Sequence, residues 1–279
     1  MRRASYLTLC ILPLLVAPLT AIRALRIPGV HHAIGLVLFG VMAYAARRLA
    51  RPEPGGADGA AALRAQGGTA WLAPTGIVAL LWVGLATPWH STPTENQMRY
   101  TVLLVGAVCV TMGSFLVKEA LGEAGERLVA SSALGASVLS GAAYVVWTSF
   151  QIGDFALRIA KQELSPAVAA MNNVFDALLF AAGALAYVAS SLFAQSLRRA
   201  GWLGTSAARA YTAVSLAALA LLLLRGVSFP GPGSSGAAWY ATPGFVVGIP
   251  ALPWFVSYFL GAVLLRGPST NRDEMEGGI

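Results

Sequence analysis

Long apolar stretches, separated by short polar or charged clusters, run the whole length of the chain. Each stretch is rich in Ala and Leu and holds about the 20 residues that a helix needs to cross ~30 Å of hydrocarbon. Transmembrane strands are shorter and alternate apolar with polar residues, so continuous stretches favour helices. The pattern predicts an all-α, polytopic transmembrane helix bundle of about eight spans, at 4–22, 27–46, 71–88, 100–117, 128–152, 167–197, 210–224 and 246–265.

Two of these spans depend on their flanking residues. The first begins with basic residues, as a secretory signal does, but no small-x-small cleavage site precedes Arg23. The next apolar stretch follows at once, which favours an uncleaved first helix over a removed signal. The seventh stretch is short between Arg209 and Arg225, so it either lets both arginines snorkel or begins earlier, near Thr205.

The Lys and Arg residues are distributed unevenly between the two sides of the membrane. Cytoplasmic loops carry the excess of Lys and Arg. An inside N-terminus places thirteen of the 19 basic residues in inner segments, namely Arg2, Arg3, Arg47, Arg48, Arg51, Arg64, Lys118, Arg127, Arg198, Arg199, Arg209, Arg266 and Arg272. The outer segments hold the other six, Arg23, Arg26, Arg99, Arg158, Lys161 and Arg225. We therefore expect both ends of the chain in the cytoplasm.

The composition agrees with lipid as the main solvent. Of the 279 residues, 57% are hydrophobic and 11% are charged, and the mean hydropathy is +0.67, whereas a soluble globular chain carries roughly 25% charged residues. The net charge of +7 follows from the basic inner segments. No basic stripe with interleaved aromatic residues exists to follow a phosphate backbone. The lipid bilayer is therefore the expected partner, and nucleic acid is not.

One transmembrane helical domain is predicted over 1–279, with three segments of other composition. The stretch 51–70 is rich in Gly, Ala and Pro and poor in large apolar residues, which predicts a flexible cytoplasmic loop. An outer loop is predicted over 226–244, where Trp239 and Tyr240 either lie at the headgroup level or cap an outward-facing cavity. A cytoplasmic tail is predicted over 266–279.

Polar residues at positions that are costly in a membrane gather on the outer side of the predicted bundle. All three histidines fall there, with an acid near the fourth span and a polar face at the start of the sixth. This candidate polar site consists of His31, His32, His90, Glu95, Asn172, Asn173 and Asp176. Asp154 and Glu163 are further acids on this side, and Arg99 and Arg158 are available as ion-pair partners. No other constellation in the sequence is suited to chemistry.

Asp176 has two interpretations. Ser165 and Pro166 mark a helix start, which puts Asp176 on one face with Asn172 and Asn173 at spacings of three and four. An ionisable group inside a span is a functional candidate. The apolar stretch 177–197 is long enough to cross by itself, however, so Asp176 also fits a position at the outer interface.

The histidines are constrained by helix geometry. Adjacent residues on a helix point about 100° apart, so His31 and His32 cannot both face one metal ion. We expect hydrogen-bonding or interfacial histidines. The alternative is a zinc or copper site made of one of them, His90 and a carboxylate. Because no recognised ligand spacing is present, no metal, cofactor or catalytic residue is assigned.

Two features of the spans concern helix packing. Small residues recur every four positions at Ala133, Ser137 and Gly141, a stripe that lets another helix approach closely where lipid supplies no hydrophobic drive for association. We expect internal packing there, with a dimer face as the alternative. In the last span, Pro250 and Pro253 free backbone carbonyls, either at a kink filled by neighbouring helices or in a cavity wall.

The connection between the sixth and seventh spans reads Arg198-Arg199-Ala200-Gly201-Trp202-Leu203-Gly204. With its flanking apolar helices it resembles bacterial multi-pass membrane proteins of unknown function. The resemblance implies no activity and no site. Trp202 also fits an anchor at the inner membrane interface.

Function can be narrowed further by the motifs that the sequence lacks. It has no serine-hydrolase elbow, P-loop or dinucleotide-binding fingerprint, and both lysines fall in loops, which argues against a retinal Schiff base. We expect a non-catalytic protein of a bacterial inner membrane, either an accessory subunit or a protein for small-molecule permeation or sensing. The alternatives are a membrane enzyme or metal-binding protein that uses the outer His, Asp and Glu groups, and a redox or haem-linked protein. A membrane protein partner or a homo-oligomer stays open.

Overall fold

A computed structural model describes residues 2–19, 30–51, 59–81, 91–162, 165–227 and 243–267. These residues contain no strand and form α1 (Arg2–Leu19), α2 (Val30–Ala50), α3 (Gly59–Leu81), α4 (Pro93–Glu123), α5 (Leu128–Ile159), α6 (Pro166–Arg199), α7 (Thr205–Arg225), α8 (Pro243–Val247) and α9 (Trp254–Arg266). Five helices in this part of the chain are long and apolar enough to cross a membrane, at His32–Ala50, Pro93–Glu123, Leu128–Ile159, Val174–Arg199 and Thr205–Arg225. The all-α prediction is confirmed for the described residues, and five of their helices are suited to crossing a membrane.

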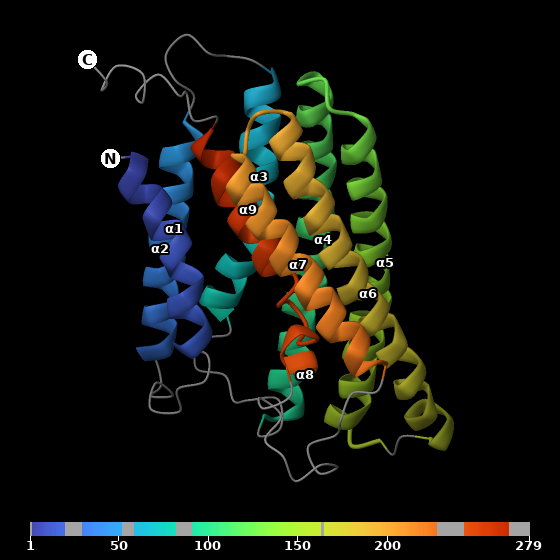
Figure 1. The fold of residues 1–279 in the computed structure, drawn as a ribbon. Helices are drawn as coiled ribbons and strands as arrows, with labels where there is room; N and C mark the ends of the chain where they lie inside the picture. The colour runs from blue at the N-terminus through green and yellow to red at the C-terminus, as the bar shows by residue number, and fades with distance from the viewer. Residues whose placement is uncertain are drawn as a thin grey trace, which may run out of the picture.

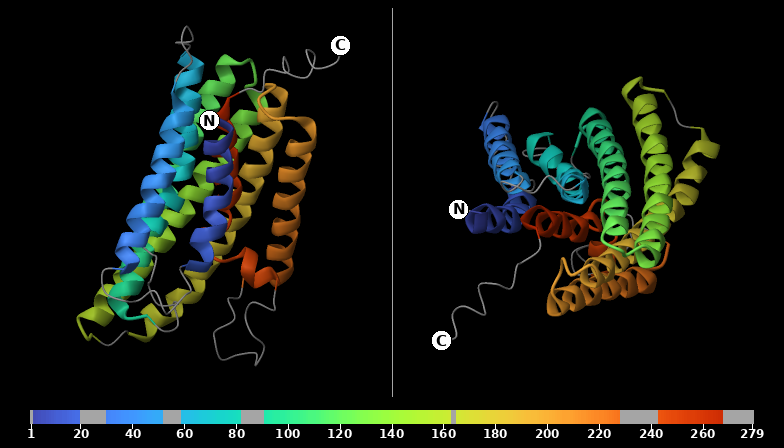
Figure 2. Two further views of the ribbon diagram at one scale, coloured as in Figure 1. Left: turned by 90° about the vertical axis from the view of Figure 1, so that its left-hand side faces the viewer. Right: turned by 90° about the horizontal axis from the view of Figure 1, so that it is seen from above.

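The helices run roughly side by side in two rows (Figures 1 and 2). Seen from above in Figure 2, α2, α3, α4 and α5 follow one another in one row, while α1, α9 and the α6–α7 pair form the other. The last helix, α9, lies between α1 and the α6–α7 pair and packs on α3. Helix α1 begins and α9 ends at the same end of the bundle, uppermost in Figure 1. We call this the basic end, because Arg2, Arg64, Arg199 and Arg266 lie there.

Local sequence signals set the starts of the longer helices. Thr92 caps α4, and its hydroxyl accepts a hydrogen bond from the Glu95 backbone N–H at 3.2 Å. The start predicted at Ser165 and Pro166 is confirmed, since the Ser165 side chain accepts from the Val168 N–H at 3.3 Å. Helix α7 begins at Thr205, the earlier of the two expected starts. The extra turn gives it 21 residues, about the number needed to cross.

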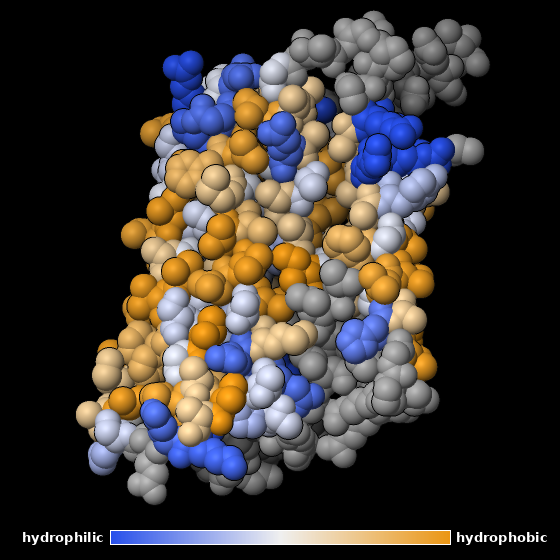
Figure 3. Space-filling model, turned by 180° about the vertical axis from the view of Figure 1, so that it is seen from behind, coloured by the Kyte–Doolittle hydropathy of each residue, from blue (hydrophilic) through white to orange (hydrophobic). Residues whose placement is uncertain are grey.

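The outer surface of the bundle is apolar between two polar ends. Figure 3 shows hydrophobic residues across the middle of one face, with hydrophilic residues gathered toward its two ends. Large apolar side chains that point outward include Leu14, Leu36, Val37, Leu139 and Leu224. The interior holds a hydrophobic core and, in addition, many small polar side chains, among them Ser114, Ser140, Ser190, Ser196 and Ser215. This distribution suits a bundle whose solvent is lipid.

Glycines let α3 lie very close to α4 and α9. A Cβ on Gly67 would come within 2.7 Å of Val117 on α4, and a Cβ on Gly68 within 2.9 Å of the Gly261 carbonyl oxygen on α9. Residues 59–70 therefore belong to α3, although their composition predicted part of a flexible loop over 51–70. The Gly and Ala content there serves close helix packing. Residues 52–58 lie outside the described residues.

The last predicted span is interrupted. Residues 248–253 form turns between α8 and α9 in place of a continuous helix over 246–265. Helix α9 has 13 residues, about 20 Å of helix, which is shorter than the ~30 Å hydrocarbon core. Most of the outer loop expected over 226–244 and of the tail expected over 266–279 lies outside the described residues.

Candidate functional site

The described members of the predicted outer site lie on separate parts of the bundle. His32 is exposed on α2, whereas Asp176 is half-buried on α6, and these two helices stand on opposite sides in Figure 2. His31 lies on α2, and Asn172 and Asn173 lie on α6, but their side chains fall outside the described part of the chain, as do His90 and Glu163 entirely. The structure thus does not bring His32 and Asp176 together.

Glu95 has a structural role at the start of α4. Its carboxylate accepts from the Thr92 backbone N–H at 2.7 Å and from the Thr92 hydroxyl at 3.1 Å. Together with the return bond from the Glu95 N–H, these contacts form a capping box. The Glu95 carboxylate therefore stabilises the start of α4.

Asp176 lies near charged and aromatic residues from two other helices. It interacts electrostatically with Arg225 at the end of α7 and with Tyr100 on α4. Arg225 also reaches the turn after α8, since a Cβ on Gly248 would lie 2.7 Å from its guanidinium. Asp176 thus contributes its charge to a group of residues around the break between α8 and α9.

A second set of charges lies at the same end, between α4 and α5. Asp154 on α5 is 4% exposed and accepts a hydrogen bond from Arg158 Nε at 2.8 Å through Oδ2. Its Oδ1 is buried without a hydrogen-bond partner among the described residues. Arg99 on α4 is also 4% exposed and donates to Asn96 and, at 3.1 Å, to Ser91. Two opposite charges are therefore buried at this end of neighbouring helices.

Polar residues continue from Asp154 along the buried face of α5. The side chains in question are buried and recur at spacings of three or four, which places them on one face of the helix. They are Ser137, Ser140, Tyr144, Thr148, Gln151 and Asp154. We call this set the α5 polar stripe. It extends from the end opposite the basic end to the centre of the bundle.

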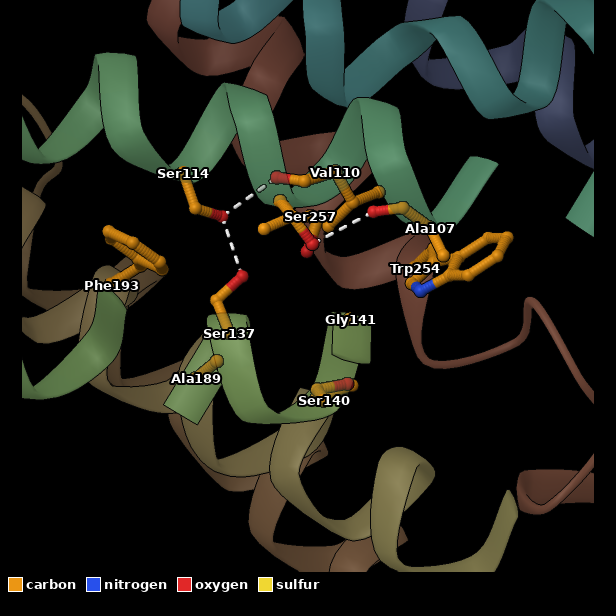
Figure 4. A pocket seen from close by; sticks show the side chains of 12 residues that line it. Ala107, Val110, Ser114, Ser137, Ser140, Gly141, Ala189, Phe193, Trp254 and Ser257 are labelled. Carbon is orange, nitrogen blue, oxygen red and sulfur yellow. Dashed lines mark hydrogen bonds between the residues drawn. The ribbon is translucent and has the colours of Figure 1, made fainter. Parts of the chain in front are cut away.

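At the centre of the bundle the stripe reaches a small cavity (Figure 4). Hydroxyl groups and small residues of α4, α5, α6 and α9 surround it, including Thr111, Ser114, Ser137, Ser140, Gly141 and Ser257. The Ser137 hydroxyl donates to Ser114 Oγ at 2.8 Å, and Ser114 donates to the Val110 carbonyl at 2.9 Å. The cavity has a volume of about 10 Å³ that is available to water, which is roughly the space that one water molecule needs.

Small residues make this cavity possible. Ala133, Ser137 and Gly141, the stripe expected from the sequence, are all buried. A Cβ on Gly141 would lie 2.0 Å from Thr111 Oγ1 on α4, so α4 and α5 touch closely there. The row of small residues therefore faces another helix of the same bundle at Ser137 and Gly141.

The break between α8 and α9 lies beside the cavity, level with the middle of α4 and α5. The Trp254 side chain, at the start of α9, lines the cavity and lies 5.0 Å from the Tyr144 ring. A Cβ on Gly106, near the middle of α4, would lie 2.7 Å from the Trp254 ring. Ala251 in the break has a φ of 75°, a conformation that costs a non-glycine residue on the order of 1–3 kcal/mol.

Two buried tyrosines lie against the break. Tyr187 on α6 donates its hydroxyl to the carbonyl of Val247, the last residue of α8, at 2.8 Å, and the Tyr144 ring packs against Trp254, the first residue after the break. Because an unsatisfied backbone group costs several kcal/mol in hydrocarbon, the Tyr187 hydroxyl stabilises the interrupted path of the chain.

The sequence contained two indications of the cavity and the break, although the predicted site was placed at the outer histidines instead. The polar residues of α5 recur with the helical period, but each Ser, Thr, Gln or Tyr alone is common in a membrane helix. Pro250 and Pro253 marked the position of the break and left open whether it lines a cavity. Nothing in the sequence indicated that Tyr144 and Tyr187 would meet it from two other helices.

No metal centre forms from the described side chains, because no three His, Cys, Asp or Glu residues among them gather closely enough to hold an ion. Cys10 and Cys109 are both free thiols. No protein-family model, curated protein or solved structure matches this chain. The features of the described residues that bear on function are therefore the α5 polar stripe, the cavity and the interrupted helix.

Proposed function

We propose that this chain is a non-catalytic membrane protein that passes or senses a small polar molecule, with its site at the hydroxyl-lined cavity beside the α8–α9 break. The interrupted helix carries the proposal. Irregular backbone at membrane depth occurs where it is buried in protein or lines an aqueous cavity. Membrane transport proteins use such half-helices to form their solute sites.

The α5 polar stripe supplies a route to this site. It leads from Asp154 at the end opposite the basic end to Ser137 at the cavity. Polar side chains along a route reduce the cost of moving a hydrated solute away from bulk water. Because the cavity has room for about one water, a larger solute requires the helices around it to separate.

The topology proposed with this function has eight spans, with the α8–α9 pair as the last. Arg2 and Arg266 lie at the same end of the bundle, as an even number of spans requires. The excess of basic residues at that end favours the cytoplasm for both termini. A bacterial inner membrane is the proposed location.

Cysteine accessibility tests the proposed site. Cys10 and Cys109 are the two cysteines of the chain, and replacing both by Ala gives a background for single cysteines. We expect Ser137→Cys, in proteoliposomes, to react with membrane-impermeant methanethiosulfonate reagents, because the separation of helices that admits a solute to the cavity would also admit the reagent and the water that ionises the thiol. A preference for the anionic or the cationic reagent would identify the charge of the preferred solute.

Leu139→Cys is the matched control. Leu139 lies on the same helix at almost the same depth as Ser137, but its side chain is 61% exposed on the outer face, where lipid excludes the reagents. Lys161→Cys, at the exposed end of α5, shows that the reagents are active. If Ser137→Cys is as inert as Leu139→Cys while Lys161→Cys reacts, the cavity is a packing void and the proposed function is wrong.

A further inference from the structure

The basic end of the bundle also holds carboxylates. Glu119, Glu123 and Glu126 all lie around the end of α4. Glu119 pairs with Lys118 at 2.8 Å, and Glu126 lies 3.8 Å from Arg199. Arg64, on α3 next to α4, and Arg266 on α9 form no ion pair with a carboxylate among the described residues.

Arg64 is held among groups that do not neutralise its charge. Its guanidinium carbon lies 5.4 Å from the centre of the Trp202 ring, and its Nη2 would lie 3.3 Å from a Cβ on Gly267. The charged neighbour with which it interacts is Arg2, another cation. Its Nε is buried and has no hydrogen-bond partner among the described residues. Among the described residues, the Arg64 guanidinium has no anionic partner.

The position of Arg64 indicates where such an anion would come from. Arg64 precedes the apolar part of α3, and Trp202 lies in the turn between α6 and α7. Tryptophan side chains favour the headgroup level of a membrane. Basic pockets between transmembrane helices on the cytoplasmic side bind phospholipid headgroups. We propose that the surface formed by Arg2, Arg64, Trp202 and Gly267 binds the phosphate of an anionic phospholipid, with Arg64 as the main contact.

Native mass spectrometry of the purified full chain tests this site. Phosphatidylglycerol and phosphatidylcholine with the same acyl chains are offered together, and the lipids that remain bound are counted. We expect the wild-type chain to retain phosphatidylglycerol in preference. Arg64→Gln should weaken that binding about fivefold, the factor that corresponds to about 1 kcal/mol per basic residue near an anionic surface.

Arg209→Gln is the control, because Arg209 is exposed at the same end, on α7, and its loss changes the net charge equally. Retention should be the same in Arg209→Gln as in the wild type. An equal loss in both variants, or none in Arg64→Gln, overturns the proposal, as does displacement of the lipid by millimolar inorganic phosphate. The wild type also provides a test without mutation, since its preference for phosphatidylglycerol should fall as salt rises, and a preference unaffected by salt contradicts the site.

Discussion

The contact between α3 and α9 positions the broken helix, and Gly261 tests it. A Cβ at this position would lie 2.8 Å from the Gly68 carbonyl oxygen and 2.6 Å from Leu72 Cδ1. Ordinary contact begins near 3.4 Å, so Gly261→Ala requires α9 to move away from α3 by about 0.6 Å, the difference at the Gly68 oxygen. The obstacle at Gly68 is backbone and cannot rotate aside. Overpacking of this kind costs about 1–3 kcal/mol.

We therefore expect Gly261→Ala to lower the free energy of unfolding by about 1–3 kcal/mol. The measurement is a titration with denaturing detergent in mixed micelles, followed by circular dichroism. Gly40→Ala is the control, because a Cβ on Gly40 would have no neighbour within 4 Å. In a helix, replacing Gly by Ala stabilises by roughly 0.5–1 kcal/mol when nothing is in the way.

The two variants should therefore change stability in opposite directions. If Gly261→Ala is as stable as Gly40→Ala, α9 does not pack on α3 through Gly68, and the position of the break in the bundle is wrong. If the double variant Gly261→Ala with Leu72→Ala loses less stability than the sum of the two single losses, Leu72 is part of the obstacle.

Other predictions concern the hydrogen bonds at the break and at the start of α4. Tyr187→Phe leaves the Val247 carbonyl without its donor and should cost about 1–3 kcal/mol in the same titration, whereas Tyr44→Phe, on the exposed face of α2, should be nearly neutral. Thr92→Ala removes the cap of α4 and should cost about 0.5–2 kcal/mol. Glu95→Gln keeps an acceptor for the capping box and should change stability by less than about 0.5 kcal/mol; a larger loss would mean that the negative charge itself is required.

The hydrophobic pattern predicted most of the helices because a membrane helix needs a continuous apolar stretch of known length. It misjudged residues 59–70, since glycine lowers helix propensity in water and Gly67 and Gly68 suggested a linker. In the structure these glycines are packing residues between α4 and α9. Composition alone does not distinguish a flexible Gly-rich segment from a helix whose neighbours approach its backbone.

The candidate site was harder to predict than the helices. His32 and Asp176 were grouped by their expected side of the membrane, but the two rows of helices separate them laterally (Figure 2). Conversely, the side chains of Ser114, Ser137 and Ser257 line one cavity only because α4, α5 and α9 pack together. Counting spans predicts on which side of the membrane a residue lies. Whether residues on one side lie close together depends on the order of the helices around the bundle, which the hydrophobic pattern does not specify.

Hydrogen–deuterium exchange of the unmodified chain in lipid nanodiscs tests most directly whether water reaches the broken helix. Peptides that cover Gly248–Leu252 are compared with peptides from the middle of α7, which lies on the outside of the bundle. We expect clearly faster exchange in the break, because its amides lie outside regular helix and beside a polar cavity. Equal protection of both segments would contradict a water-accessible site at the interrupted helix.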